Sequence, residues 1–411
     1  MGPMSGLKVL DLSRVLAGPW ATQMLADLGA DVIKIERPEG GDDTRGWGPP
    51  YLRDAQGRET TESAYYLSAN RGKRSVAIDL ASPEGQKLVR DLALQSDVLV
   101  ENFKVGGLAR YGLAWQDLAP LNPRLIYCSI SAFGQDGPLA QAAGYDAMMQ
   151  AMGGIMSITG AADDEAGASP GAGPQKVGVA IVDLMAGMYA VSAVTSALYE
   201  RERSGKGQHI DLALLDTVVS WLANQSMNYL VSGRAPQRQG TAHPNIVPYQ
   251  VFRTADGSLM LAVGNDTQFA RLCSSAGRDE LARDPRFATN AERVRHRDRL
   301  VPLLDQLLRT RKTGSWVAAL QPLGVPCAPI NDIAQVFEEP QVKHRGLRIS
   351  LPHPIAGQAP GVRNPIRYSR SALEHGAAPP LLGQHTGEVL SERLGLGPAD
   401  VQALRERGIV R

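Results

Sequence analysis

The most constraining feature of the chain is a long apolar segment, Val177–Tyr199, which contains a single carboxylate, Asp183. By length alone the segment could cross a bilayer. Because it contains Asp183 and is followed at once by Glu200–Arg203, we instead expect a buried helix of a large soluble protein. A carboxylate in apolar surroundings is poorly solvated, which raises the energy of its anion. Asp183 is therefore either a structural hydrogen-bond partner or a nucleophile that is kept away from water.

The charge balance argues against a general nucleic-acid-binding surface. Of the 411 residues, 43 are Lys or Arg and 42 are Asp or Glu, so the formal net charge is only +1. Nucleic-acid surfaces need a clear excess of basic charge. Since 43% of the residues are hydrophobic, a sizeable core is expected, and the length predicts two or three domains.

The cysteines and histidines predict neither disulfides nor a metal site. Cys128, Cys273 and Cys327 are far apart, form no CxxC pair and follow no secretory signal. We therefore expect reduced thiols in a cytoplasmic protein. The seven histidines form no HxxxH or HExxH spacing, which is the arrangement typical of a zinc site on a helix.

The first 135 residues alternate between strand and helix patterns. Helices are predicted over about 20–28 and 83–94, and strands over Lys8–Leu12, Asp31–Glu36, Ser75–Leu80, Asp97–Glu101 and Leu125–Ile130. Strands separated by helices of this length favour a parallel sheet, so we predict an α/β, Rossmann-like large domain. The first turn reads SRVLAGP. It lacks the GxGxxG spacing that brings backbone close to a pyrophosphate, which argues against a dinucleotide-dependent dehydrogenase.

The remaining chain is expected to form a smaller α+β domain and a return to the large one. A polar segment rich in turn formers, Gly233–His243, suggests a boundary, and a hairpin is predicted around Ala255–Gly257. We expect residues 1–232 to form the N-terminal part of the large domain and residues 233–324 the small domain. Residues 325–411 would then return and complete the large domain with C-terminal helices.

Several long segments resemble the class III coenzyme A transferases, the family of formyl-CoA and carnitine-CoA transferases. They run from end to end and include LDLSRVLAGPWATQMLADLGADVIKIERPEGGDDTRGW, NRGKRSVAIDL, DVLVENFKVGGLARYGL, KVGVAIVDLMAGMYA and PLLGQHTGEVL. The resemblance implies that Asp183 is the catalytic nucleophile and that coenzyme A is a substrate, with no metal or redox cofactor. It also implies an interlocked homodimer, which nothing in the sequence pattern itself indicates.

The resemblance further implies a set of residues that contact CoA. They follow predicted strands or lie in the next loops, where an open parallel sheet binds ligands; they are Arg37, Lys73, Asn102, Phe103 and Arg110. Basic side chains suit the diphosphate and 3′-phosphate of CoA. Other readings stay open, because Arg37 could pair with Glu36 or Glu39 on the surface, and Lys73 could lie in a solvated turn.

The acceptor acid is less constrained by the sequence. GTAHPNIVPYQVF and VGNDTQFARLC are most similar to the succinyl-CoA-dependent dicarboxylate branch of the family. The distal carboxylate of such an acid needs a cationic or donor-rich partner, and we consider His243, Arg14 and Arg45 for this role. His243 could equally be a loop residue. Trp47 is either a wall of the acyl pocket or a core aromatic residue.

At two positions the chain differs from related enzymes of known activity, and these differences argue against two activities. Formyl-CoA:oxalate transferases carry a glutamine where this chain has Leu16, which cannot hydrogen-bond a small polar diacid. The 2-methylacyl-CoA racemases carry a proton-shuttling histidine where this chain has Tyr145. A phenol with a pKa near 10 is a poor proton shuttle at neutral pH, so Tyr145 is expected to pack or to hydrogen-bond. A racemase or epimerase and a catalytically silent acyl-CoA-binding protein remain the alternatives.

Overall fold

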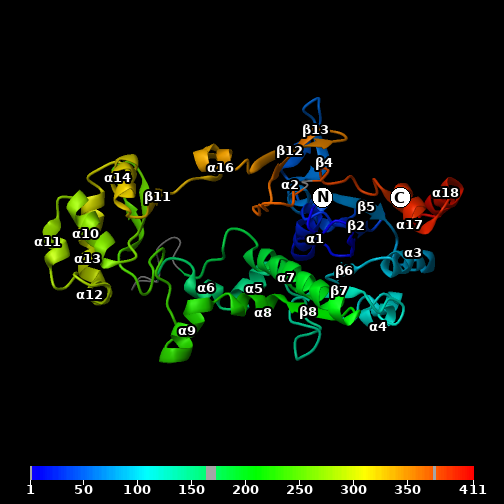
Figure 1. The fold of residues 1–411 in the computed structure, drawn as a ribbon, viewed down its shortest axis with the longest axis horizontal. Helices are drawn as coiled ribbons and strands as arrows, with labels where there is room; N and C mark the ends of the chain where they lie inside the picture. The colour runs from blue at the N-terminus through cyan, green and yellow to red at the C-terminus, as the bar shows by residue number, and fades with distance from the viewer. Residues whose placement is uncertain (1, 163–172, 374–375) are drawn as a thin grey trace. The chain divides into compact units, whose positions relative to one another are not determined.

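The computed structural model describes residues 2–162, 173–373 and 376–411 (Figure 1). Contacts divide the chain into two compact units. The first unit comprises Met1–Ile155, Val177–Ser226 and Pro340–Arg411, and the second comprises Met156–Lys176 and Met227–Glu339. The first unit is thus assembled from three separate stretches of sequence.

The first unit is built on a six-stranded sheet in the order β5-β2-β1-β6-β7-β8. Every neighbouring pair in it is parallel. The strands are β1 (Lys8–Asp11), β2 (Asp31–Glu36), β5 (Lys73–Ala77), β6 (Val98–Glu101), β7 (Ile126–Ser131) and β8 (His209–Ala213). This confirms the predicted α/β class with a parallel sheet.

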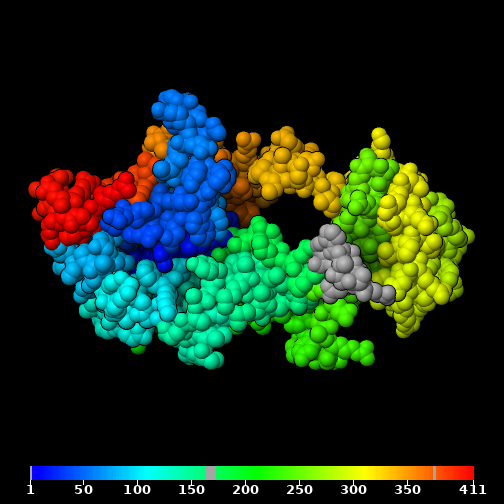
Figure 2. Space-filling model, turned by 180° about the vertical axis from the view of Figure 1, so that it is seen from behind, coloured from blue at the N-terminus to red at the C-terminus, as the bar shows by residue number. Residues whose placement is uncertain are grey.

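Helices cover both faces of this sheet. One face packs on α1 (Ala17–Asp27) and α7 (Ile181–Ser204), which contribute small side chains such as Ala21 and Ala186 to the core. The other face packs on α3 (Pro83–Leu94), α4 (Trp115–Leu118), α17 (Thr386–Leu394) and α18 (Pro398–Glu406). The C-terminal residues, red in Figure 2, therefore lie against the N-terminal half of the same unit, where Val410 bridges to Ile78.

Most predicted elements of the sheet are present, with shifted ends. Strand β2 has its predicted bounds, and Ser82 caps α3 by accepting a hydrogen bond from the Gly85 amide, as expected of its residue type. Helix α1 begins three residues earlier than predicted, because Pro19 is tolerated within the first helical turn. Strand β5 was predicted over Ser75–Leu80 but begins at Lys73 and ends at Ala77.

The long apolar segment forms α7, the one described helix that is long and apolar enough to cross a membrane. In the structure it packs on α1 and on the sheet, with Val182, Ala190 and Val194 buried. Near its end Arg201 is buried and pairs with Asp97 at 3.0 Å. The helix therefore lies in the core of the first unit, as the charged residues that follow it suggested.

The other elements of the first unit connect or extend this core. They are η1 (Asp43–Gly46), β3 (Tyr51–Arg53), β4 (Glu59–Ser63), α2 (Ala64–Ala69), η2 (Ala109–Tyr111), α5 (Asp146–Met152), α8 (Leu214–Ser220), α16 (Pro340–His344), β12 (Arg348–His353) and β13 (Gly357–Val362). Strands β3–β4 and β12–β13 form two separate antiparallel pairs. Two short helices, α6 (Ile155–Ile158) and α9 (Ala223–Ser232), span the divisions between the units.

The second unit has a three-stranded antiparallel sheet and its own core. Its strands are β9 (Tyr249–Arg253), β10 (Ser258–Ala262) and β11 (Cys327–Pro329), in the order β11-β10-β9, so the predicted hairpin is present. Its helices are α10 (Asp266–Ser275), α11 (Asp279–Arg283), α12 (Asn290–Arg295), α13 (Arg297–Leu308), α14 (Thr313–Leu320), η3 (Gln321–Leu323) and α15 (Ile333–Glu338). Phe252, Phe269 and Trp316 are fully or almost fully buried in this core.

Candidate active site

The site lies where the strand order of the sheet reverses. From the central strand β1 the chain builds outward through β2 and β5, then returns to the other side of β1 with β6. The loops after β1 and β6 therefore diverge at this point, which is where open α/β sheets form a ligand-binding crevice. Two cavities are lined by residues of these two loops.

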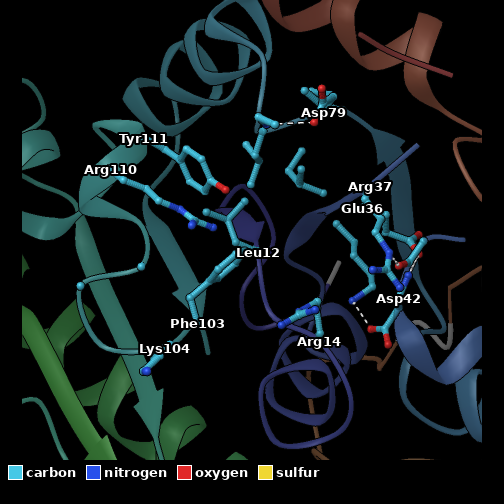
Figure 3. Close-up of a pocket in the computed structure, with 18 of the residues that line it drawn as sticks. Leu12, Arg14, Glu36, Arg37, Asp42, Asp79, Phe103, Lys104, Arg110 and Tyr111 are labelled. Atoms are coloured by element: carbon cyan, nitrogen blue, oxygen red, sulfur yellow. Dashed lines mark hydrogen bonds and ion pairs between the residues drawn. The ribbon is translucent and has the colours of Figure 1, made fainter. Parts of the chain in front are cut away.

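The larger cavity has a volume of about 600 Å³ and an excess of exposed cations. Figure 3 shows Arg110, Tyr111 and Phe103 on one side of it and Arg37, Glu36 and Asp42 on the other, with Arg14 between. Within the described residues, Lys104 and Arg110 form no ion pair, and both are exposed. A polyanionic ligand would meet these two unpaired positive charges here, beside Arg14 and Arg37, which share the single carboxylate of Asp43.

The smaller cavity has a volume of about 260 Å³ and contains Asp183. It shares Arg14, Phe103 and Lys104 with the larger cavity, so the two adjoin. Both volumes together suit an extended ligand rather than a single small acid. A ligand with its charged end among the cations would reach the carboxylate with its other end.

The local structure of α7 fixes Asp183 at the first turn of a helix of 24 residues. The Asp146 carboxylate accepts hydrogen bonds from the amides of Val182 at 2.7 Å and Asp183 at 3.3 Å, so it caps the helix from α5. Gln150 in turn donates to Asp146 at 2.6 Å. The backbone of the carboxylate-bearing residue is thereby tied to a second helix.

Burial, and after it the charge of Asp146, raises the pKa of Asp183 from 3.8 to about 7. Removal from water disfavours the anion, and a neighbouring negative charge adds to that effect. A carboxylate of this kind is more basic than an ordinary one, and it is still ionised in a large fraction of molecules at neutral pH. It can act as a nucleophile or as a proton acceptor.

The start of α1 lines the same cavity as Asp183. Val15, Leu16 and Ala17 line it, and α1 has no side-chain cap. Uncapped amides at a helix start are donors that favour negative charge. Helices α1 and α7 also approach closely, because a Cβ on Gly187 would lie 2.8 Å from the Ala17 carbonyl oxygen. The packing of α1 against α7 therefore determines where the start of α1 and Asp183 lie relative to each other.

The structure brings most of the candidate residues from the sequence to these cavities. Arg37 and Arg110 line the larger one, Leu16, Asn102, Tyr145 and Asp183 line the smaller one, and Arg14 and Phe103 line both. The Arg14 guanidinium lies 5.5 Å from the centre of the Phe103 ring, and Tyr145 is 70% exposed. The side-chain amide of Asn102 accepts a hydrogen bond from the Arg14 amide and donates one to the Arg14 carbonyl.

Two candidates are instead buried in ion networks. The Lys73 ammonium contacts Asp11 at 3.0 Å, the Pro19 carbonyl at 2.9 Å and Asn70 at 2.9 Å, and its side chain is fully buried. Burial opposes the charge of Asp11, but Lys73, Lys34 and two hydroxyl groups outweigh burial and hold the pKa of Asp11 at about 2. Lys73 is therefore a buried strand residue, not a solvated turn.

Arg45 pairs with two carboxylates rather than facing the solvent. It contacts Glu36 at 2.8 Å and Glu62 at 3.1 Å, and its guanidinium lies 3.7 Å from the Tyr66 ring centre. The Pro380 carbonyl accepts a further hydrogen bond at 3.0 Å. Its donors are thus largely occupied within the protein.

Trp47 and His243 lie in different surroundings. Trp47 is 43% exposed and packs edge-on against Tyr65, with ring centres 5.1 Å apart. Burial and then the charges of Asp183 and Asp146 raise the pKa of Tyr65, although neither ring of this pair lines the two cavities. His243 belongs to the second unit, where it stacks on Tyr249 at 5.3 Å.

Sequence reasoning missed several lining groups. Lys104 directly follows Phe103, a predicted contact in the loop after β6, and this position could have identified it. Asp43 links Arg14 at 3.1 Å and Arg37 at 2.6 Å, and Ser131 ends β7 in the smaller cavity. Asp146 carried no signal of its own, because its role depends on a helix that begins 35 residues later.

Comparison with solved structures agrees with this fold. The chain is similar to a CAIB/BAIF family protein from Brucella suis, with a TM-score of 0.84 and 49% sequence identity over 95% of this chain and 99% of that one.

Sequence comparison gives the family. The chain is 52% identical to a succinate–glutarate CoA-transferase from Agrobacterium fabrum, over 95% of both chains. It is 42% identical to the human succinyl-CoA:glutarate CoA-transferase, over 99% of this chain and 90% of that one. The model of CoA-transferase family III matches residues 4–386. The chain therefore belongs to CoA-transferase family III.

Proposed function

We propose that this protein transfers coenzyme A reversibly from succinyl-CoA to a second dicarboxylic acid, with glutarate as the first acceptor to test. The single observation that carries the proposal is the position of Asp183, a poorly solvated carboxylate that lines the smaller of two adjoining cavities, the larger of which is lined by exposed cations. The names of the relatives supply the donor and the acceptor class.

The proposed pose places the CoA phosphates in the larger cavity. Arg37, Lys104 and Arg110 would contact them, and Phe103 would pack on the nucleotide. Phosphate recognition by guanidinium groups is strong because the hydrogen bonds are charge-assisted. The acyl thioester would then lie in the smaller cavity beside Asp183.

The proposed chemistry exchanges one activated acyl bond for another. A carboxylate oxygen of Asp183 attacks the thioester carbonyl, the C–S bond breaks, and CoA leaves as a thiolate. The thiolate attacks the Asp183 carbonyl of the resulting anhydride, which releases succinate and leaves an aspartyl-CoA thioester. The acceptor carboxylate then attacks this thioester, its C–S bond breaks, and CoA leaves again as a thiolate while a new anhydride forms. The thiolate finally attacks the acceptor carbonyl of that anhydride, the C–O bond to Asp183 breaks, and acceptor-CoA and the free Asp183 carboxylate result. No net proton is transferred, and no metal or redox group is required.

Two features of the site favour these steps. Each intermediate is sensitive to hydrolysis, so exclusion of water matters, and Asp183 is only partly exposed. Leu16 and Ala17 at the start of α1 line the same cavity, and we propose that their backbone amides stabilise the oxyanion formed in each attack.

For the distal carboxylate of the acceptor we propose Arg14. It lines both cavities, its side chain is 44% exposed, and Asp43 is its ion-pair partner. Leu16 would form an apolar wall beside it, and the Trp47–Tyr65 pair would bound the acyl group. Lys73 and Arg45 hold loops in place in this proposal, since their donors are already bound. We assign no role in this pose to His243, which belongs to the second unit.

We also propose that the protein is a cytoplasmic homodimer, as the family resemblance implies. One face of α7 carries exposed large apolar side chains, including Tyr189 at 41% and Tyr199 at 63% exposure, and such faces mark association sites. Light scattering coupled to size-exclusion chromatography tests this: a mass of a single chain would contradict it.

Covalent trapping tests the proposed function. The protein is incubated with succinyl-CoA, quenched with hydroxylamine and digested, and the Asp183 peptide is examined by mass spectrometry. We expect an Asp183 hydroxamate that is absent from Asp183→Ala, together with glutaryl-CoA formation when glutarate is added. Exchange of the α-proton of a 2-methylacyl-CoA with deuterated solvent would favour an isomerase instead. CoA binding without any adduct across a panel of acyl-CoAs would favour a silent binding protein.

A further inference from the structure

The turn between β1 and α1, which lines the same cavity as Asp183, has an unusual backbone conformation. Val15 has a φ of +69°, and Ala223 is the only other non-glycine residue in the described ranges with a positive φ. A β-branched residue is strongly disfavoured in this left-handed region. Such a conformation persists only where the surrounding structure holds it. Val15 also lines the smaller cavity.

Asn102, at the end of the neighbouring strand β6, holds this turn from outside. Its side-chain oxygen accepts a hydrogen bond from the Arg14 amide at 2.8 Å, and its side-chain nitrogen donates to the Arg14 carbonyl at 2.7 Å. The two bonds fix both polar groups of the residue that precedes Val15. A carboxamide suits this task because it carries a donor and an acceptor side by side.

Buried side chains hold the turn from the other direction. Lys34 donates to the Ser13 carbonyl at 2.8 Å, the Asp11 carboxylate accepts from the Ser13 amide at 2.9 Å, and Asp42 accepts from the Val15 amide at 3.3 Å. Asn102 joins the turn to the end of β6 across the reversal of strand order, together with the Leu12 amide, which donates to the Val100 carbonyl at 2.8 Å. We call the two hydrogen bonds between the Asn102 side chain and the Arg14 backbone the clamp. The clamp therefore links the loops after β1 and β6, which line both cavities.

We propose that Asn102 is a positioning residue, which holds Val15 in its left-handed conformation and so fixes the α1 amides against Asp183. The inference rests on the proposed function, because those amides matter only if an oxyanion forms beside Asp183. Since both ends of the Asn102 amide are already bound to Arg14, its main role is to order the turn rather than to contact CoA.

A double-mutant cycle tests the clamp. Asn102→Ala is compared with the parent protein and, separately, in a Val15→Gly background, because glycine adopts a positive φ without steric cost. We expect Asn102→Ala to lower kcat at least tenfold in the parent, with less than a twofold change in KM for succinyl-CoA. In the Val15→Gly background the same substitution should lower kcat by no more than about twofold. Equal losses in both backgrounds, or a loss that falls mainly on KM, would overturn the proposal.

Asn122→Ala is the matched control. Asn122 also bonds backbone, donating to the Ser96 carbonyl at 3.0 Å and accepting from the Arg124 amide at 3.3 Å, but it lies outside the two cavities. We expect this variant to lose stability with kcat unchanged.

Hydrogen exchange separates this inference from the proposed function. In Asn102→Ala the amides of Arg14 and Val15, which donate to Asn102 and Asp42 in the parent, should exchange at least tenfold faster than in the parent, whether or not the protein turns over succinyl-CoA. Unchanged exchange at these two amides would overturn the clamp. Absence of any CoA transfer by the parent protein would instead refute the proposed function.

Discussion

Replacing Asp183 by Asn should stabilise the protein, and increasingly so as the pH rises. The pKa of Asp183 is about 7 in the folded state against an ordinary value of 3.8. Between these two values the folded chain binds more protons at this position than the unfolded chain does. Raising the pH therefore favours unfolding, and the loss of stability is complete above about pH 7. A neutral amide of the same size does not carry this cost.

The size of the effect follows from the two pKa values. Each pKa unit corresponds to about 1.4 kcal/mol, so the rise from 3.8 to about 7 corresponds to about 4 kcal/mol at alkaline pH. The advantage of Asp183→Asn over the parent should grow by about 2.5 kcal/mol between pH 5 and pH 8. Below about pH 4 the advantage should vanish, because the carboxyl group is then neutral in both states.

Urea unfolding followed by circular dichroism at constant ionic strength measures this difference. Asp136→Asn serves as the control, because it removes one carboxylate from an exposed position in the same unit. The free energy of unfolding of Asp183→Asn relative to the parent should rise with pH more steeply than that of the control. If the two variants show the same pH dependence, Asp183 is well solvated or paired in solution, and the reasoning from burial is refuted.

Four further outcomes follow from the site and its supports. Asp146→Asn keeps a capping oxygen but removes a charge that raises the pKa of Asp183, so the acid limb of kcat/KM should move to lower pH in a pH–rate profile. Gly187→Ala places a Cβ against the backbone of α1 and should cost about 1–3 kcal/mol in denaturant unfolding, with a fall in kcat. Lys73→Met leaves a buried carboxylate unpaired and should cost about 3–5 kcal/mol; wild-type-like melting would contradict that. Arg110→Ala should raise KM for succinyl-CoA about tenfold with little change in kcat, and it should weaken the salt dependence of KM.

The sequence was sufficient to predict the parts of the fold that depend on local pattern. The parallel sheet follows from alternating strands and helices, and the Ser82 cap follows from its residue type. The apolar segment around Asp183 predicted a core helix, and the structure has one. These features are encoded within a dozen or so neighbouring residues, so periodicity and capping chemistry suffice to find them.

The environment of each polar side chain could not be predicted in the same way. Lys73 and its partner Asp11 are separated by 62 positions, and Asn102 and the Arg14 backbone by 88. Nothing local distinguishes a lysine that binds phosphate from one that neutralises a buried carboxylate. The sheet order decides between them, because it determines which strand ends lie together.

Asp146 affects both the position and the pKa of Asp183, the proposed nucleophile. Asp146 accepts the amides at the start of α7 and thereby fixes the backbone of Asp183. The same negative charge adds to burial in raising the pKa of Asp183. A neutral cap such as serine would satisfy one of these amides, but it would leave the proposed nucleophile less basic. A carboxylate cap thus couples the position of Asp183 to its basicity, and a single substitution at Asp146 should change both.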